Sequence, residues 1–174
     1  MEAFLIRRAV PEDVDALIDI NIRVWRVTYR GSIADEVLDA MTADSLRDKW
    51  VTTVANTRSQ DRFCFVATSA GSVVGYAVCG KNRDDRSAFQ WLMYAIYILP
   101  EYQRKGIGKN LFFAAIEEMR KLKVASFMLY VLKGNYSARH FYEALHPGWQ
   151  DEQSIEIEGN QYTAMAYGWP QLPL

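Results

Sequence analysis

Apolar residues follow strand and helix spacings in turn along the chain. Residues 3–9 alternate weakly between apolar and polar, which predicts a short strand. Apolar positions at helical spacing predict a helix over 11–29, opened by a proline where a missing N–H costs nothing. A second helical region covers 35–55 and is expected to break near 42–44, where Asp44 is the candidate cap.

The rest of the chain predicts strands placed around two further helices. Residues 62–68 and 73–79 suit a hairpin, and an apolar run over 89–99 ends at Pro100. The remaining expected elements are a helix over 104–122, a strand over 125–132, a helix over 135–145, and a hairpin of 150–158 with 161–169 that turns at Gly159-Asn160.

This order predicts one mixed α/β domain over residues 1–174. A strand, two helices, a meander of three strands and then helical crossovers give a mixed sheet with helices on both faces. No Pro-, Gly- or Ser-rich linker marks a second domain, and no internal repeat is visible.

Composition narrows the class of partner. The 174 residues carry a formal net charge of -1, so electrostatics give no reason to expect nucleic acid or an anionic membrane. Cys64 and Cys79 lack metal-site or C-x-x-C spacing and are expected to be buried thiols, with no metal site. The N-terminus lacks a long apolar stretch, and we therefore expect a cytoplasmic protein.

Candidate chemistry lies between Pro100 and the following helix. The segment EYQRKGIGK places two glycines and several basic residues at a helix N-terminus. Exposed backbone N–H groups and the positive end of the helix dipole favour phosphate there. On its own this segment also suits a solvated basic helix start, because short glycine motifs often match by chance.

Two motifs resemble those of the GNAT superfamily of N-acetyltransferases. IYILPEYQRKGIG, from Ile96 to Gly108, is similar to its V-x-P-x-x-Q-x-x-G-x-G signature, and NYSARHFYEAL, from Asn135 to Leu145, to its N-x-x-A-x-x-F-Y-E-x-L element. The resemblance implies the acyl-CoA N-acyltransferase fold over nearly the whole chain. This fold has a mostly antiparallel, mixed, seven-stranded sheet, splayed between strands 4 and 5 and flanked by about four helices.

The resemblance also implies acetyl-CoA as co-substrate and assigns its contacts. The strand backbone at Ile96, Tyr97 and Ile98 would bond the pantetheine arm, and one of those N–H groups would polarise the thioester carbonyl. Asn135 would hydrogen-bond the pantetheine, and Arg139 is a further candidate contact. The pyrophosphate would be held at Gln103, Arg104, Lys105, Gly106, Ile107, Gly108 and Lys109.

The implied reaction is direct attack of a primary amine on the thioester, without metal or covalent intermediate. Tyr142 matches the family's general acid, and a phenol with a pKa of about 10 can protonate the leaving thiolate. On helix periodicity alone, Phe141 and Tyr142 suit core aromatics equally well.

The general base is missing from its expected place. Many relatives carry a glutamate on the long central strand, where this chain has Leu92. The candidates left open are Glu36 or Asp35, Tyr94 or Tyr97 through ordered water, and bulk solvent. The departure also motivates a second hypothesis, an acyl-CoA-binding sensor or regulatory module with weak or lost catalysis.

The acceptor amine is not specified by the sequence, and a small molecule and a peptide both remain open. Tyr29 and Glu36 are weak candidates for the acceptor site, because family members build it from their first helices. His140 and His146 are given no role. The aromatic-rich last hairpin makes a homodimer one possibility and internal packing the other.

Overall fold

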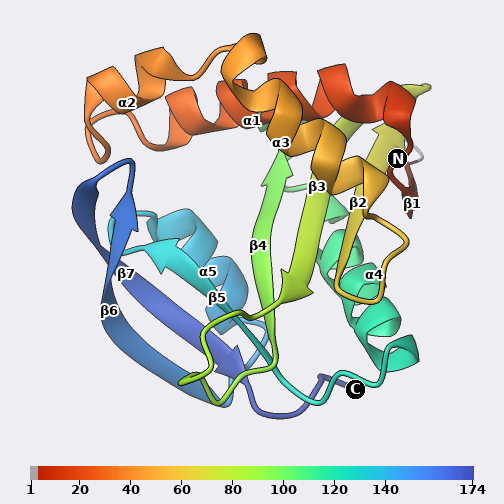
Figure 1. Ribbon diagram of the computed structural model, residues 1–174, viewed down its shortest axis with the longest axis vertical. Coiled ribbons are helices and arrows are strands. Elements are labelled where there is room, and N and C mark those ends of the chain that lie inside the picture. The colour runs from red at the N-terminus through yellow and green to blue at the C-terminus, as the bar shows by residue number, and fades with distance from the viewer. Residues whose placement is uncertain (1–3) are drawn as a thin grey trace.

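The computed structural model describes residues 4–174 as one seven-stranded sheet with helices on both faces (Figure 1). Helices α1 to α3 cover one face, and α4 and α5 lie on the other. The strands run in the order β1-β2-β3-β4-β5-β7-β6, and every pairing is antiparallel except that of β4 with β5. The expected fold class and the splay after strand 4 are confirmed.

The N-terminal half agrees with the apolar pattern in type and order of elements. Its strands and helices are β1 (Phe4–Arg8), α1 (Val14–Thr28), α2 (Asp35–Ala40), α3 (Ala43–Ala55), β2 (Arg62–Ser69) and β3 (Ser72–Lys81). A 3-10 turn over Pro11–Asp13 precedes α1. The first residue of the strand expected over 3–9 lies outside the described residues.

The C-terminal half holds β4 and β5, the strands between which the candidate site lies. Its elements are β4 (Trp91–Ile98), α4 (Ile107–Lys121), β5 (Phe127–Leu132), α5 (Tyr136–Glu143), β6 (Trp149–Ile157) and β7 (Asn160–Trp169), with a 3-10 turn over Pro100–Tyr102. The helix expected over 104–122 therefore begins three residues later than the apolar periodicity indicated.

Two local predictions were wrong. The cap of α3 is Thr42, whose side chain accepts a hydrogen bond from the Ser45 N–H at 3.2 Å, so Asp44 lies inside the first turn. The last hairpin turns at Glu158-Gly159, because Ile157 pairs directly with Asn160. Both turn residues have positive φ, at 48° and 77°, which matches the twist of a two-residue hairpin loop.

The core is divided by the sheet into two main clusters. On one face, Leu17 and Ile20 of α1 and Trp50 of α3 belong to a single buried cluster. On the other face, Phe112 and Met119 of α4 cluster with Phe127 of β5. Cys64 and Cys79 are buried free thiols, as expected, and burial raises the pKa of Cys64 to about 12.

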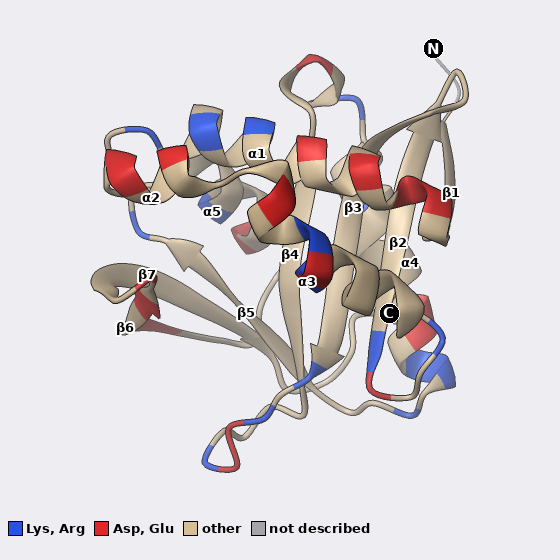
Figure 2. Cartoon of the chain, turned by 45° about the horizontal axis from the view of Figure 1, so that its top comes forward, with Lys and Arg blue, Asp and Glu red and all other residues tan. Residues whose placement is uncertain are grey.

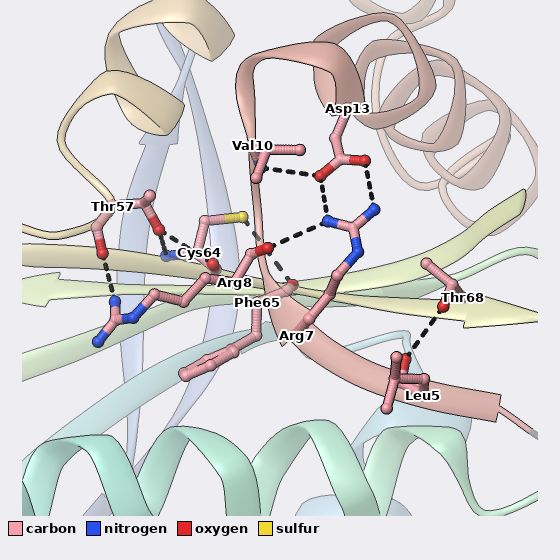
Figure 3. Close-up of polar contacts among 9 residues, drawn as sticks. All are labelled: Leu5, Arg7, Arg8, Val10, Asp13, Thr57, Cys64, Phe65 and Thr68. Carbon is pink, nitrogen blue, oxygen red and sulfur yellow. Dashed lines mark hydrogen bonds and ion pairs between the residues drawn. The ribbon is translucent and has the colours of Figure 1, made fainter. Parts of the chain in front are cut away.

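Polar contacts attach β1 to both helical layers, and Figure 3 shows those with Asp13, before α1, and with Thr57, after α3. Arg7 forms a two-pronged ion pair with Asp13, at 2.6 and 2.8 Å, and Asp13 also accepts the Val10 N–H at 2.8 Å. Arg8 bonds the carbonyl of Thr57, just after α3, and also pairs with the buried Glu118 of α4 in the other layer. The first strand thus fixes α1 and α4 relative to the sheet.

The Arg7–Asp13 pair predicts a pH-dependent stability. Burial opposes ionisation of Asp13, but hydrogen bonds from Arg7 and Val10 outweigh it and lower its pKa. A lowered pKa gives stability that is present above the unfolded-state value and lost as pH falls through the folded-state value. We expect Asp13→Asn to cost about 1–3 kcal/mol at pH 7 and clearly less near pH 3, by urea unfolding. Equal losses at both pH values would contradict this role.

Candidate active site

A gap opens where β4 and β5 part. The two strands pair only at Trp91–Phe127 and Leu92–Met128. Beyond that point the Leu99 N–H bonds the Val74 carbonyl of β3 at 2.9 Å. Because alternate residues of an antiparallel strand point their amides to opposite sides, those of Ile96 and Ile98 face the gap. The backbone of β4 thus offers the N–H groups of Ile96 and Ile98 to the gap without a partner strand.

A cavity of about 530 Å³ occupies the gap and continues to both faces of the sheet. Its volume lies in the range of small-molecule and cofactor sites. The lining includes Tyr29, Ile96, Tyr97, Ile98, Gln103, Arg104, Gly106, Gly108, Lys109, Asn135 and Tyr142, all predicted site residues. Segments that are far apart in sequence therefore meet at one cavity.

The loop before α4 turns its backbone N–H groups outward. Arg104 and Gly106 both adopt left-handed conformations, with φ of 61° and 85°. The first backbone hydrogen bond of the helix runs from the Asn110 N–H to the Gly106 carbonyl at 3.1 Å, so the preceding amides of the first turn have no helical partner. Left-handed residues in the loop and unpaired amides in the first turn of the helix together form a concave site that suits an anion.

Helix α5 brings Asn135 and Tyr142 to the opposite wall of the cavity. The Asn135 side chain caps the helix by accepting the Ala138 N–H at 3.1 Å. Tyr142 is only 7% exposed and lines the cavity. Burial raises the pKa of its hydroxyl, so the phenol keeps its proton across the physiological range. Within residues 4–174 this hydroxyl has no hydrogen-bond partner, which leaves it available to a ligand.

Contacts with β7 and α4 fix α5 in place. The Tyr167 hydroxyl, fully buried, donates to Glu143 at 2.6 Å, and Arg139 donates to that hydroxyl at 3.4 Å. On the α4 side the Phe141 ring lies over Gly108, where a Cβ would sit 3.5 Å from it. The helix that carries Tyr142 is thus held by contacts to both neighbours.

The far end of the cavity is walled by α1 and by tyrosines. Tyr29 lies 3.4 Å from Tyr97, hydroxyl to hydroxyl, and its hydroxyl also bonds Asn135. The Trp25 ring meets Tyr29 edge-on at 5.1 Å. Burial raises the pKa of Tyr29, against hydrogen bonds with Tyr97 and Asn135 that lower it. These contacts join the first helix to the helix that carries Tyr142.

Comparison with known proteins identifies the family that shares this arrangement. The family model for the acetyltransferase (GNAT) family matches residues 22–146, which include the loop, both strands of the gap and α5. The chain belongs to the GNAT acetyltransferase family. The predicted enzyme class, an N-acetyltransferase, is thereby confirmed.

Individual proteins similar to this chain are also N-acetyltransferases. The N-acetyltransferase YuaI of Bacillus subtilis is 30% identical over 96% of this chain and 93% of its own length. Spermidine N(1)-acetyltransferase of Thermoplasma acidophilum is 25% identical over 79% of this chain and 83% of its own. The structure of PaiA N-acetyltransferase from the same organism, in complex with coenzyme A, has a TM-score of 0.75 and 21% identity, and it covers 96% of this chain and 99% of that one.

Some predicted GNAT site residues do not line the cavity. Lys105 lies 4.9 Å over the Tyr102 ring, and the Ile107 side chain is buried against β2 and β3, so only its backbone faces the loop. Arg139 points away from the cavity to the Lys133 carbonyl at 3.1 Å and to β7. Glu36 is exposed on α2, outside the lining.

No carboxylate lines the cavity among the residues that the structure describes. Leu92, at the expected position of the base, packs beside Phe89 and Met128. Asp35 is bound to Arg30 at 2.9 Å and also lies outside the lining. Of the candidates for the base, the structure brings only Tyr94 and Tyr97 to the cavity.

Other lining residues were not predicted from the sequence. Ser137, His140 and Phe141 share one face of α5 by helical spacing, and that face looks into the cavity. The spacing was visible in the sequence, but which face points inward depends on the packing of α5. Over residues 4–174, no group of three metal-ligating side chains occurs, and no helix is long and apolar enough to cross a membrane.

The attachment of α5 predicts a stability effect that is separate from chemistry. Tyr167→Phe removes the hydroxyl that bonds Glu143 and leaves that carboxylate with a weaker partner, Arg139, at 3.8 Å. We expect a loss of about 1–2 kcal/mol in urea unfolding. Tyr136→Phe, at a tyrosine that is 65% exposed, is the matched control and should change little. Equal effects of the two variants would show that the hydroxyl does not anchor the helix.

Proposed function

We propose that this N-acetyltransferase transfers an acetyl group from acetyl-CoA to a primary amine of a small molecule or peptide. One observation carries the proposal. The unpaired amides of β4, the loop before α4 and the Tyr142 hydroxyl all meet at a single cavity. The β4 amides suit an amide-bearing chain, the loop suits a phosphate, and the Tyr142 hydroxyl suits a leaving thiolate.

The residues fit coenzyme A in chemical type. Ile96 and Ile98 present backbone groups that suit the amides of the pantetheine arm, while the Ile98 carbonyl already accepts the Gln103 side chain at 3.0 Å. The loop amides, with Arg104 and Lys109 beside them, suit the pyrophosphate. The coenzyme A complex of the PaiA structure supports the same assignment by family likeness.

The protein's own groups then supply polarisation and a proton. Bound acetyl-CoA supplies the activated acyl group as a thioester. A β4 backbone N–H that faces the gap would hydrogen-bond the carbonyl oxygen as negative charge develops on it. As the C–N bond forms and the C–S bond breaks, Tyr142 would donate its proton to the sulfur and later regain one from the acylated nitrogen.

Tyr142→Phe tests the transfer step. The phenyl ring keeps the packing but cannot donate a proton, so kcat should fall about 100-fold or more. Affinity for acetyl-CoA, measured by calorimetry, should stay the same, because the cofactor contacts lie elsewhere. Release of free thiol from acetyl-CoA over a panel of amines gives the rates.

Tyr136→Phe on the same helix serves as the control and should retain full activity, since its ring lies outside the cavity. A protein that binds acetyl-CoA but releases no thiol, with or without Tyr142→Phe, would instead be the acyl-CoA-binding module. The homodimer and the cytoplasmic location stay predictions.

A further inference from the structure

The two ends of the cavity differ in charge. Arg104, Lys109 and His140 line the end beside α4 and α5. The residues that line the opposite end are themselves uncharged: Val24, Thr28, Tyr29, Tyr94, Tyr97 and Tyr130. Two charged side chains act on them from outside the lining. Arg62 lies over the Tyr94 ring at 5.3 Å, and Asp84, which pairs with Arg86 at 3.2 Å, adds to burial in raising the pKa of Tyr130. β4 and β5, which flank the gap, carry no charged residue at all (Figure 2). The end left for the acceptor is therefore neutral and aromatic.

The hydroxyls at this end cannot serve as strong bases. Burial raises the pKa of both Tyr29 and Tyr97, so both phenols stay protonated near neutral pH. Their oxygens, 3.4 Å apart, are hydrogen-bonded and can accept an N–H from an amine without removing its proton. The Tyr142 phenol, whose pKa burial also raises, is likewise neutral.

Several charged groups on neighbouring elements pair with one another. Arg30, after α1, pairs with Asp35 and Asp39 of α2 at 2.9 and 3.2 Å. On the sheet, Glu152 of β6 pairs with Lys133 at 2.7 Å. The hairpin β6–β7 joins α2 through apolar side chains and the Tyr162 hydroxyl, which accepts the Ala34 N–H at 3.3 Å. Glu36 lies on the outer surface of α2, away from the lining.

This neutrality decides the charge state in which an amine can enter. An ammonium moved into such a site without a counter-ion loses several kcal/mol of hydration energy. At pH 7 about one in seven α-amino groups is neutral, against roughly one in 2,500 lysine-type amines, from reference pKa values near 7.8 and 10.4. The neutral form differs about 300-fold in abundance between the two classes.

We infer that the acceptor is a weakly basic primary amine, the α-amino group of an amino-acid derivative or peptide, and not a lysine side chain or a polyamine. The inference rests on the proposed function and departs from the polyamine in the name of the spermidine relative. The neutral nitrogen attacks the thioester carbon, the C–S bond breaks, and the surplus proton on nitrogen replaces the one that Tyr142 gives to sulfur. Amine and acetyl-CoA become amide and free thiol without a separate base.

The test compares alanine amide with Nα-acetyl-lysine amide and spermidine, by thiol release from acetyl-CoA between pH 6.5 and 10. At pH 7 we expect kcat/KM for alanine amide to be at least tenfold higher, since the greater nucleophilicity of basic amines offsets part of the 300-fold difference. Each profile should rise with pH and level at the pKa of its own amine. Comparable rates for the basic amines, or a profile that levels well below the amine's pKa, would overturn the inference.

A charge variant gives a second readout. Thr28→Asp places a carboxylate on the acceptor wall, and Thr28→Asn is its uncharged match. We expect only the aspartate variant to raise kcat/KM for the lysine derivative, by about tenfold. Thermal unfolding of both variants checks that they fold, and equal behaviour of the two contradicts the inference. If no amine of any class supported thiol release, the proposed function itself would fail. That result is distinct from activity on basic amines alone, which would overturn only the inference.

Discussion

The site depends on one constraint, which is that backbone amides need partners. β4 and β5 satisfy it together for two residue pairs and then separate, so the amides of Ile96 and Ile98 turn into open space. Such groups are costly in an apolar interior and acceptable beside water or a ligand. Pro100 ends the strand just beyond, and the chain returns as α4 with its N-terminus at the same opening. The cavity and its polar lining follow from this separation.

The sequence predicted the parts of the site that local chemistry determines. Gly106 and the basic loop are readable because turn conformation at a helix start depends on neighbours only a few residues away. Asn135 was singled out by the family motif, and the structure adds that it caps α5. The start of α4 was placed too early, because Arg104 continues the helical periodicity but adopts a left-handed backbone. Residue type alone does not reveal that a non-glycine residue takes such a conformation.

The parts of the cavity that the sequence did not place depend on contacts between distant residues. Arg139 matches a motif position, yet its guanidinium donates a hydrogen bond to Tyr167 on β7, which lies 28 positions further along the chain. Tyr130 looked like an ordinary strand residue until the parting of β4 and β5 exposed it to the cavity. Tertiary pairing determines where such side chains point, and the apolar pattern of a single chain does not specify that pairing.

The short β4–β5 ladder has a mechanical consequence. Only the pairs Trp91–Phe127 and Leu92–Met128 bridge the two halves of the sheet by backbone, and they lie at one end of the gap. A small rotation about that end is magnified with distance, so the far mouth widens more than the hinge moves. Tyr29, Tyr97 and Asn135 connect the halves there through side chains alone. A molecule that bonds both walls would act as a missing strand and stiffen the whole sheet.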